Sequence, residues 1–558
     1  MNTLSFRRSA RILGSFLLAA VLLAGCIATD RTTDRTTALK PRLVVFLVID
    51  GLPQWQVTDY RDQLARDGFA RVLDRGAWFA DAPYGHAFTV TGAGHATMLT
   101  GAYPHRTGII GNEWRDRTTA TPVYCAGDEA HAYIDNSTAP LAGTSPKNLQ
   151  VETVGDVLKR ADPRAKVISV SGKDRGAILP AGKTGTAYMY MGDSGRFASS
   201  TYYMKAHPAW VTAFNAEKRA DRYFMTSWSP LLPDAAYARS LPDDRPWYNR
   251  GGKLPKVMGE GQDKPGPAFY GSLLPSPFAD ALTLDFARAA IAAEGLGQDD
   301  VPDILSISLS GHDYTNHAYG AESRLSHDHL LQLDRMLEAF FADLDRTVGK
   351  DNYVAVLTAD HGFMPAPEYS ASLGRDAGRQ NIPQTLERLN DGLSAKFGAG
   401  KWVRTWSANG VLLDNALIAQ KQVDRRVLET EARRILMTEP GIVEVFAATD
   451  LASKTLAAGT PFLAQTLQTF YADRSPDLLV IARPYWMFES RRAATSTHGS
   501  PHPYDHHVPI LFYGPRWFGS GRVDKRVEVV DIAPTLAGIM AVPVPAASEG
   551  KVLPLPAR

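Results

Sequence analysis

RLVVFLVIDG, residues 42–51, is a nearly continuous run of β-branched and other apolar side chains that ends at Asp50. Its length and composition are typical of a β-strand buried on both faces. Three later runs have the same form: AKVISVS at 165–171, PDILSISLS at 302–310 and NYVAVLT at 352–358. Helical patterns lie between these runs, at 151–161, 279–294 and 326–348. The alternation predicts an α/β fold, a three-layer α/β/α sandwich with a mostly parallel central sheet.

Polar, titratable residues follow each of the four predicted strands. They are Asp50, Lys173 with Arg175, Asp313, and Asp360 with His361. One aspartate after a strand is common because turns favour it, but turns alone explain four such placements poorly. Ligands bind beyond the carboxyl ends of the strands in sheets of this kind. We therefore expect a functional site at that edge of the sheet.

The stretch FTVTGAGHATMLTGAYPHRTGIIGN, residues 88–112, contains threonines followed by a Gly-Ala-Gly turn. A short helix is predicted from near Gly92 to Gly101, because glycine commonly ends a helix. A hydroxyl at the N-terminus of that helix would face free N–H groups and the positive end of the helix dipole, where a nucleophile can attack phosphate. The alternative is a threonine-rich loop with a simple capping residue.

Three long segments interrupt the strand–helix alternation, at about 113–150, 183–278 and 371–475. The first two have weak periodicity, whereas the third contains patterns of a small α+β insertion. Such segments often form lids or walls of binding sites, and we interpret them as insertions into one catalytic domain, residues 41–558. Two further strands and a closing helix are predicted after the third segment: PDLLVIARPYWMF, HVPILFYG and VVDIAPTLAGIM.

Residues 1–26 have the form of a lipoprotein signal peptide. Arginines precede an apolar run that ends Leu23-Ala24-Gly25-Cys26, which resembles a bacterial lipobox. The alternative is an ordinary signal peptide whose cleavage site lies near a cysteine. Residues 27–40 are polar and are predicted to form a flexible tether. We expect a bacterial periplasmic protein that is attached to the outer membrane through lipid on Cys26.

The composition excludes some partners. The 558 residues include 60 basic and 59 acidic side chains, a formal net charge of +1, and no basic stripe is visible. We therefore predict no nucleic-acid partner. Cys125 is the only cysteine besides Cys26, and its acidic neighbours indicate a structural or incidental role. Nothing in the sequence requires an oligomer, and we expect a monomer.

Six aspartate and histidine residues are candidate metal ligands: Asp50, Asp313, His317, Asp360, His361 and His498. Mixed carboxylate and imidazole ligands suit zinc. Asp313 and His317 are four residues apart, so one turn of chain can direct both at one ion. Taken singly, each residue has an ordinary alternative as a turn or loop residue, so the prediction rests on the set.

The order of these motifs closely resembles the alkaline phosphatase superfamily. The motifs are IDG at 49–51, the stretch 88–112, KDRGA at 173–177, D-x-x-x-H at 313–317, ADHG at 359–362 and HGS at 498–500. More narrowly, they are similar to the PafA-type, phosphate-insensitive monoesterases, which neighbour the nucleotide pyrophosphatases/phosphodiesterases. The resemblance extends from about Leu43 to the C-terminal VVDIAPTLA and implies an alkaline phosphatase-like fold with two zinc ions per chain.

The resemblance also implies roles for single residues. Thr91 falls on the nucleophile, with Thr89 as its rival. The implied ligands of one zinc site are Asp50, Asp360, His361 and the Thr91 oxygen. The implied ligands of the other are Asp313, His317 and His498. Asn112 falls on an amide that donates to a phosphoryl oxygen, and Lys173 and Arg175 fall on the pair that marks monoesterases.

We predict hydrolysis of small-molecule phosphate monoesters through a covalent phosphothreonine in a di-zinc site. Lys173 and Arg175 would favour a monoester dianion over a diester monoanion. A local salt bridge through Asp174 is the alternative explanation of KDRGA. The alternative function is a phosphodiesterase or nucleotide pyrophosphatase on the same scaffold, and a non-catalytic lipoprotein with structural zinc is the remaining class. A sulfatase is disfavoured because no Cys/Ser-x-Pro-x-Arg site is present.

Overall fold

The computed structural model describes residues 40–249 and 251–558. The predicted signal peptide, Cys26 and the tether as far as residue 39 lie outside the described residues, and those interpretations stay predictions. Pro41–Arg558 make up one unit of mutually contacting residues. No helix in the described part of the chain is long and apolar enough to cross a membrane.

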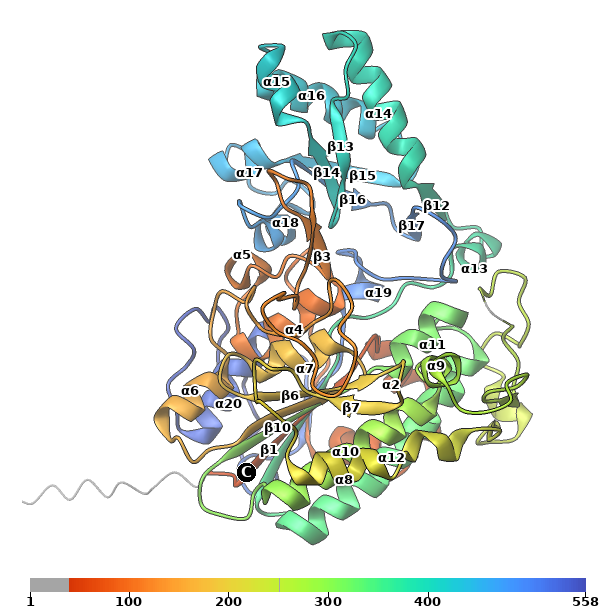
Figure 1. Cartoon of the computed structure of the whole chain (residues 1–558), viewed down its shortest axis with the longest axis vertical. Helices are drawn as coiled ribbons and strands as arrows, with labels where there is room; N and C mark the ends of the chain where they lie inside the picture. Colours follow the sequence, from red (N-terminus) through yellow and green to blue (C-terminus); the bar gives the residue numbers. More distant parts are fainter. Residues whose placement is uncertain (1–39, 250) are drawn as a thin grey trace, which may run out of the picture. The chain divides into compact units, whose positions relative to one another are not determined.

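A nine-stranded sheet lies at the centre of the fold (Figure 1). In spatial order its strands are β19 (Gly521–Val523), β2 (Ala77–Phe79), β18 (Ile510–Tyr513), β11 (Tyr353–Thr358), β1 (Leu43–Ile49), β10 (Asp303–Leu309), β5 (Val167–Ser171), β6 (Thr186–Met191) and β7 (Arg196–Ala198). The four strands predicted from apolar runs, β11, β1, β10 and β5, are adjacent and mutually parallel. The register places Ile49 opposite Leu309, so the residues that follow β1 and β10 leave the sheet at the same edge.

Helices cover both faces of this sheet, which confirms the predicted three-layer sandwich. Figure 1 shows α4 (Thr91–Thr100) and α7 (Asp174–Ala181) on one side, and α8 (Ala209–Ala216), α10 (Pro277–Glu294) and α12 (Arg324–Leu344) on the other. The other helices of this part that bear on the argument are α6 (Val154–Ala161), α11 (Gly311–Tyr319) and α20 (Ile532–Met540). Every residue of β1 is buried, as expected of a strand covered on both faces.

Two strands of the central sheet lie in a segment whose weak periodicity predicts an insertion. β6 pairs in parallel with β5, and β7 returns antiparallel to β6, so residues 186–198 correct the insertion predicted at 183–278. Their sequences, TAYMYM and RFA, lack the branched aliphatic run of the other strands, and the turn between them is GDSG. β2 and β19 have three residues each, which is too short for a periodicity signal.

The third inserted segment forms a separate four-stranded sheet. Its strands, in spatial order, are β13 (Val403–Ser407), β14 (Gly410–Leu413), β16 (Leu478–Ala482) and β15 (Ile442–Ala447). Its helices α14 (Ile382–Phe397) and α16 (Arg425–Leu436) pack on it, and the small sheet has a hydrophobic core of its own. β16 pairs with β14 and β15, so the inserted sheet continues beyond residue 475, where the sequence pattern predicts the insertion to end. The predicted boundary is wrong because periodicity locates a strand without identifying its partner.

A two-stranded sheet joins the start of this segment to the chain that follows it. β17 (Trp486–Glu489) runs parallel to β12 (Gly378–Asn381). The pair therefore joins the start of the inserted segment to the chain that leads back toward His498.

At Gly94, helix α4 packs closely against Asp360, in the chain that follows β11. A Cβ atom on Gly94 would lie 2.1 Å from the carbonyl oxygen of Asp360. Gly94→Ala should therefore displace α4 and lower the free energy of unfolding by about 1–3 kcal/mol, the usual cost of overpacking. Thermal melting, followed by circular dichroism, measures the effect.

Gly538→Ala in α20 is the matched control. Gly538 is exposed, and no atom lies within 4 Å of an added Cβ, so alanine should stabilise this helix by about 0.5–1 kcal/mol. Equal melting temperatures for Gly94→Ala and the unaltered chain would contradict the close approach.

Candidate active site

Thr91 is the first residue of α4, and Gly101 ends this helix with a φ of 67°, as predicted. The Thr91 hydroxyl oxygen lies 3.4 Å from Nε2 of His361 and 3.5 Å from Nη2 of Arg175. The hydroxyl of Thr89 instead donates to the carbonyl oxygen of Ser500 at 3.0 Å. Of the two rival threonines, Thr91 is therefore the one whose hydroxyl faces the other candidate residues.

Three carboxylates converge beside Thr91, each just beyond the end of a neighbouring strand. Asp50 follows β1, Asp313 lies in the first turn of α11 after β10, and Asp360 follows β11. Each is at most 1% exposed. Asp50 Oδ1 and Asp313 Oδ1 accept no hydrogen bond from the described residues. Because buried carboxylate oxygens without donors are costly unless a cation neutralises them, these atoms suit metal ligands.

Three histidines present the same nitrogen to these carboxylates. The Nδ1 atoms of His317, His361 and His498 each lie 2.9 Å from a backbone carbonyl oxygen, those of Ser496, Gly362 and Thr89 respectively. A carbonyl oxygen can only accept, so each Nδ1 carries a proton, and in a neutral imidazole the lone pair is then on Nε2. This fixing of the tautomer and ring orientation is typical of metal-ligating histidines.

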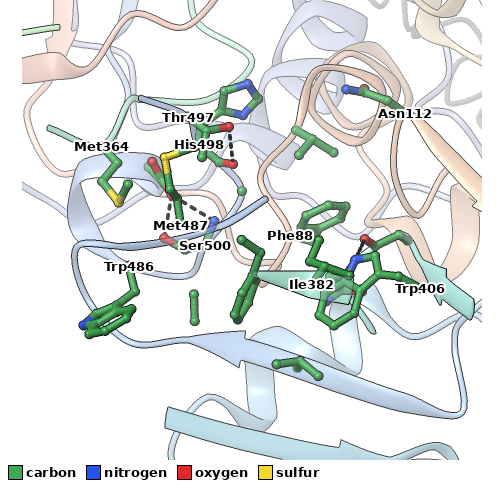
Figure 2. Close-up of a pocket in the computed structure, with 18 of the residues that line it drawn as sticks. Phe88, Asn112, Met364, Ile382, Trp406, Trp486, Met487, Thr497, His498 and Ser500 are labelled. Carbon is green, nitrogen blue, oxygen red and sulfur yellow. Dashed lines mark hydrogen bonds between the residues drawn. The ribbon is translucent and has the colours of Figure 1, made fainter. Parts of the chain in front are cut away.

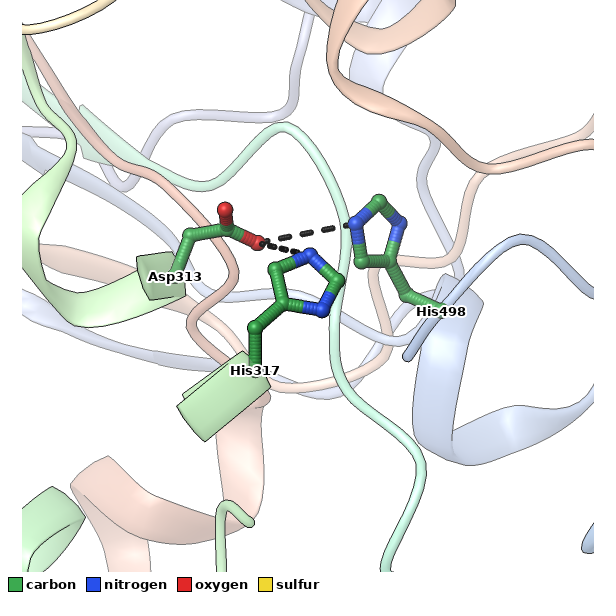
Figure 3. Close-up of side chains that lie close together, drawn as sticks. All are labelled: Asp313, His317 and His498. Carbon is green, nitrogen blue, oxygen red and sulfur yellow. Dashed lines mark ion pairs between the residues drawn. The ribbon is translucent and has the colours of Figure 1, made fainter. Parts of the chain in front are cut away.

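The Nε2 atoms meet the carboxylates in two adjoining groups. In the first group, the Nε2 atoms of His317 and His498 lie 3.4 and 3.5 Å from Asp313 Oδ1 (Figure 3). The ligand atoms of these three residues lie within 4.8 Å of one another, and so do those of Asp50, Asp313 and His361. The first group is the predicted set Asp313, His317 and His498.

The second group differs from the predicted set by one residue. It contains Asp313 where the resemblance implies Asp360, although Asp360 Oδ2 lies only 3.3 Å from Nε2 of His361. Asp313 is therefore shared between the groups, which places them side by side. Carboxylate and imidazole donors in this combination fit zinc in both places.

Two basic side chains complete the charge pattern. Nζ of Lys173 lies 2.8 Å from Asp50 Oδ2 and 2.5 Å from Asp313 Oδ2. Burial alone would lower the pKa of Lys173, but the Asp313 and Asp50 carboxylates outweigh burial and raise the pKa above its usual value. The same ammonium group overcomes burial at Asp313 and holds its pKa well below the usual range. The pKa of Asp50, by contrast, is raised well above its usual value by burial and by the neighbouring Asp360, so this group of carboxylates has too few positive partners without a further cation.

Residues 44–505 match the family described as type I phosphodiesterase / nucleotide pyrophosphatase. The chain belongs to this family. Most of the described chain, including all six candidate ligands, lies within the matched residues.

Known relatives are similar over nearly their whole length. A calcium-transporting ATPase of Myroides odoratus is 33% identical, covering 92% of this chain and 94% of that protein. Alkaline phosphatase PhoV of Synechococcus elongatus is 34% identical, covering 93% of each. A crystal structure of wild-type alkaline phosphatase PafA superposes with a TM-score of 0.84 at 29% identity, covering 92% of this chain and 98% of that one. These findings confirm the predicted superfamily and the prediction of an enzyme, and they support hydrolysis of phosphate esters.

The side-chain amide of Asn112 is held in one orientation. Its Oδ1 accepts a hydrogen bond of 2.7 Å from the backbone N–H of Gly92, the residue after Thr91. The amide NH₂ group makes no hydrogen bond with the described residues, and Asn112 lines a cavity beside the site. The amide is therefore free to donate to an anion near Thr91.

Asp174 does not form the local salt bridge that was the alternative explanation of KDRGA. It accepts hydrogen bonds from the Tyr124 hydroxyl and, at 2.9 Å, from the N–H of Gly143, both in the inserted segment 113–150. Among the described residues, no ion pair joins Asp174 to Lys173 or to Arg175, and Lys173 pairs with Asp50 and Asp313 instead. Tyr124 also accepts from Nη1 of Arg175 at 3.1 Å, so the segment 113–150 orients this guanidinium. Sequence reasoning missed Tyr124, because no local pattern connects it to Arg175.

His95 is a second residue to which sequence reasoning assigned no role. Its Nδ1 lies 2.9 Å from the carbonyl oxygen of Thr91 and 3.2 Å from Asp360 Oδ2, and its Nε2 lies 2.9 Å from the Ser308 hydroxyl. It therefore ties the start of α4 to β10 and to the end of β11. Its position one turn after Thr91 was the available signal.

Proposed function

We propose that this chain hydrolyses phosphate monoesters through a phosphothreonine on Thr91, with two zinc ions held by its six aspartate and histidine ligands. The observation that carries the proposal is the convergence of a buried helix-terminal hydroxyl, three carboxylates and three fixed imidazoles at one edge of the sheet. Relatives named alkaline phosphatase, at 30–34% identity, support a monoesterase.

The ligand sets leave room for a substrate. Asp50, Asp360 and His361 would hold one ion beside Thr91, and Asp313, His317 and His498 would hold the other on the side of the leaving alcohol. Bound zinc would supply positive charge for the oxygens that attack and leave phosphorus. Structural zinc sites usually have four protein ligands, whereas each set here has three apart from Thr91. This count favours catalysis over a structural role for the metal.

The chain's own residues would carry out two displacements. Thr91 Oγ forms a bond to phosphorus and loses its proton, while the bond from phosphorus to the ester oxygen breaks and the departing alcohol takes up a proton. Water then cleaves the phosphothreonine and restores the hydroxyl. The positive end of α4 and the free amide of Asn112 stabilise the phosphoryl oxygens in both steps.

The positive charges of Lys173 and Arg175 favour a monoester. A monoester dianion carries one more negative charge than a diester, and Arg175 lies 3.5 Å from the Thr91 hydroxyl, where a phosphoryl oxygen would be bound. The second candidate is a phosphodiesterase or nucleotide pyrophosphatase, which the description of the matched family favours. The two candidates differ in whether these cations or a second ester group occupy the space beside Thr91.

The cellular setting belongs to the same proposal. The lipobox supports a periplasmic enzyme that is attached to the outer membrane through lipid on Cys26. We expect a monomer that acts on small-molecule phosphate monoesters and not on nucleic acid, since the net charge of +1 offers no electrostatic attraction to a polyanion.

Removal of metal tests the proposed centre. Exhaustive chelation should reduce hydrolysis of a monoester to a background level, and added zinc should restore it. Without metal, no other group supplies the positive charge that the attacking and leaving oxygens need. Metal analysis of the active sample should give about two zinc ions per chain, and circular dichroism should show that the chelated chain stays folded. Full activity after chelation would contradict the metal-dependent reaction.

The two basic residues test the preference for monoesters. Lys173→Ala and Arg175→Ala should each lower kcat/KM for a monoester by about 10²–10³, the usual loss for one group that stabilises transition-state charge. The loss for a diester with the same leaving group should be smaller. Arg160→Ala is the control, since this exposed arginine pairs with Glu152 outside the site. Equal losses on both substrates would favour the diesterase alternative.

A further inference from the structure

A cavity of about 360 Å³ opens directly beside the candidate active site. Asn112, His317 and His498 line the part nearest the site, and residues of the inserted segment and of the chain after it, 480–488, line much of the remainder. Figure 2 shows Asn112 and His498 on one side of the cavity, with Trp406 and Trp486 across from them. The volume is within the range of small-molecule sites. The cavity is therefore continuous with the groups that surround Thr91.

Four aromatic rings lie in the cavity's apolar wall. They are Phe88, Trp406, Trp486 and Phe488, and none of them is fully buried. Trp406 and Phe488 lie in mutual contact, with ring centroids 5.4 Å apart and planes inclined by 58°. Large apolar rings that stay partly exposed in a concave surface usually indicate a binding site.

The rings are held in place before any ligand binds. The indole N–H of Trp406 donates to the carbonyl oxygen of Ala408 at 2.9 Å, and that of Trp486 donates to Asp376 Oδ1 at 3.0 Å. Little ordering is therefore needed when a flat ligand packs against them.

Phe88 connects this wall to the reacting groups. Its ring lies between Gly111 and Gly499, whose added Cβ atoms would each lie 3.1 Å from the ring. These glycines adjoin Asn112 and His498 in the sequence. A group that extends from phosphorus past His498 therefore meets Phe88 first and the two tryptophans beyond it.

We infer that this cavity binds the leaving group of the substrate and selects a planar aromatic one. The inference rests on the proposed function, in which His317 and His498 stand on the side of the leaving alcohol. A planar ring can pack its whole face against the aromatic wall, whereas a polyol of similar size would turn part of its hydroxyl groups toward these rings.

The planar group has two possible sources, a nucleobase or a simple aryl ester. The amide of Asn409 lines the cavity, is 8% exposed and makes no hydrogen bond with the described residues. It offers a donor and an acceptor to a base edge and nothing to an unsubstituted aryl ring. Two pairs of substrates separate these sources.

The first pair is adenosine 5′-monophosphate and ribose 5-phosphate, which share the reacting oxygen and differ in the base. The second pair is 2-naphthyl phosphate and phenyl phosphate, which differ in aromatic area. In the unaltered chain the larger aromatic member of at least one pair should have the higher kcat/KM by about tenfold, and Trp406→Ala should reduce that ratio at least fivefold. A preference confined to the naphthyl pair indicates an aryl leaving group, and a preference for adenosine 5′-monophosphate indicates a nucleobase.

Trp210→Leu is the matched control. Trp210 is also half-buried with a bonded indole N–H, but it lies on α8 and not in the cavity, so its ratios should stay within twofold of the unaltered chain. If Trp406→Ala does not fold, Phe488→Leu carries the same expectation. Ratios near one in the unaltered chain, or ratios that these cavity variants leave unchanged, would overturn the inference.

Binding separates this inference from the proposed function. Calorimetry on Thr91→Ala should give a lower Kd for the larger aromatic member of the preferred pair than for its partner, whether or not the chain turns over either ester. Tighter aromatic binding without any turnover in the unaltered chain would sustain the cavity's role and reject the monoesterase. Turnover of both members of each pair at equal rates, with equal Kd values, would support the monoesterase and reject the proposed role of the cavity.

Discussion

The burial of three carboxyl groups at one edge of a parallel sheet is the constraint on which the rest of the site depends. Asp50, Asp313 and Asp360 follow adjacent strands in the same direction, so the register of β1 with its two neighbours brings their carboxylates together. In a buried environment these carboxylates repel one another, and their arrangement is stable only where nearby cations compensate the repulsion. Lys173 supplies one positive charge, and the proposed zinc ions would supply the remainder.

The same edge also sets the geometry of the neutral groups. The three histidines are oriented by backbone carbonyl oxygens, so their free nitrogens face the carboxylates without any contribution from charged partners. Thr91 is placed by the start of α4, which Gly94 allows to pack closely on the chain after β11. The site thus follows from strand register and close helix packing, and each ligand depends on elements far apart in the sequence.

Sequence reasoning succeeded where a signal is local. The four central strands are buried on both faces, and their sequences are therefore nearly unbroken apolar runs. Because these strands are parallel, the residues that follow them lie at the same edge of the sheet. It failed for β6, whose TAYMYM lacks such a run. It found the strand β16 but not its membership of the inserted sheet, because an apolar run does not identify the partner strands. Tyr124 and Trp406 were out of reach for the same reason, because their roles depend on contacts across the fold and not on neighbours in the chain.

The central sheet and the inserted segments make different contributions. The sheet edge gathers the carboxylates and the candidate nucleophile. The segment 113–150 orients Arg175 through Tyr124, and β13 and β17 provide three of the four aromatic rings of the cavity. Changes in the insertions can therefore alter which esters bind without altering how phosphorus reacts.

The most direct test of the central claim is to trap the covalent intermediate. A monoester labelled at phosphorus is mixed with the enzyme, the reaction is quenched in acid within one turnover, and the labelled peptide is sequenced by mass spectrometry. We expect phosphate on Thr91 and no labelled peptide from Thr91→Ala. Label on Thr89, or steady turnover by Thr91→Ala, would contradict it.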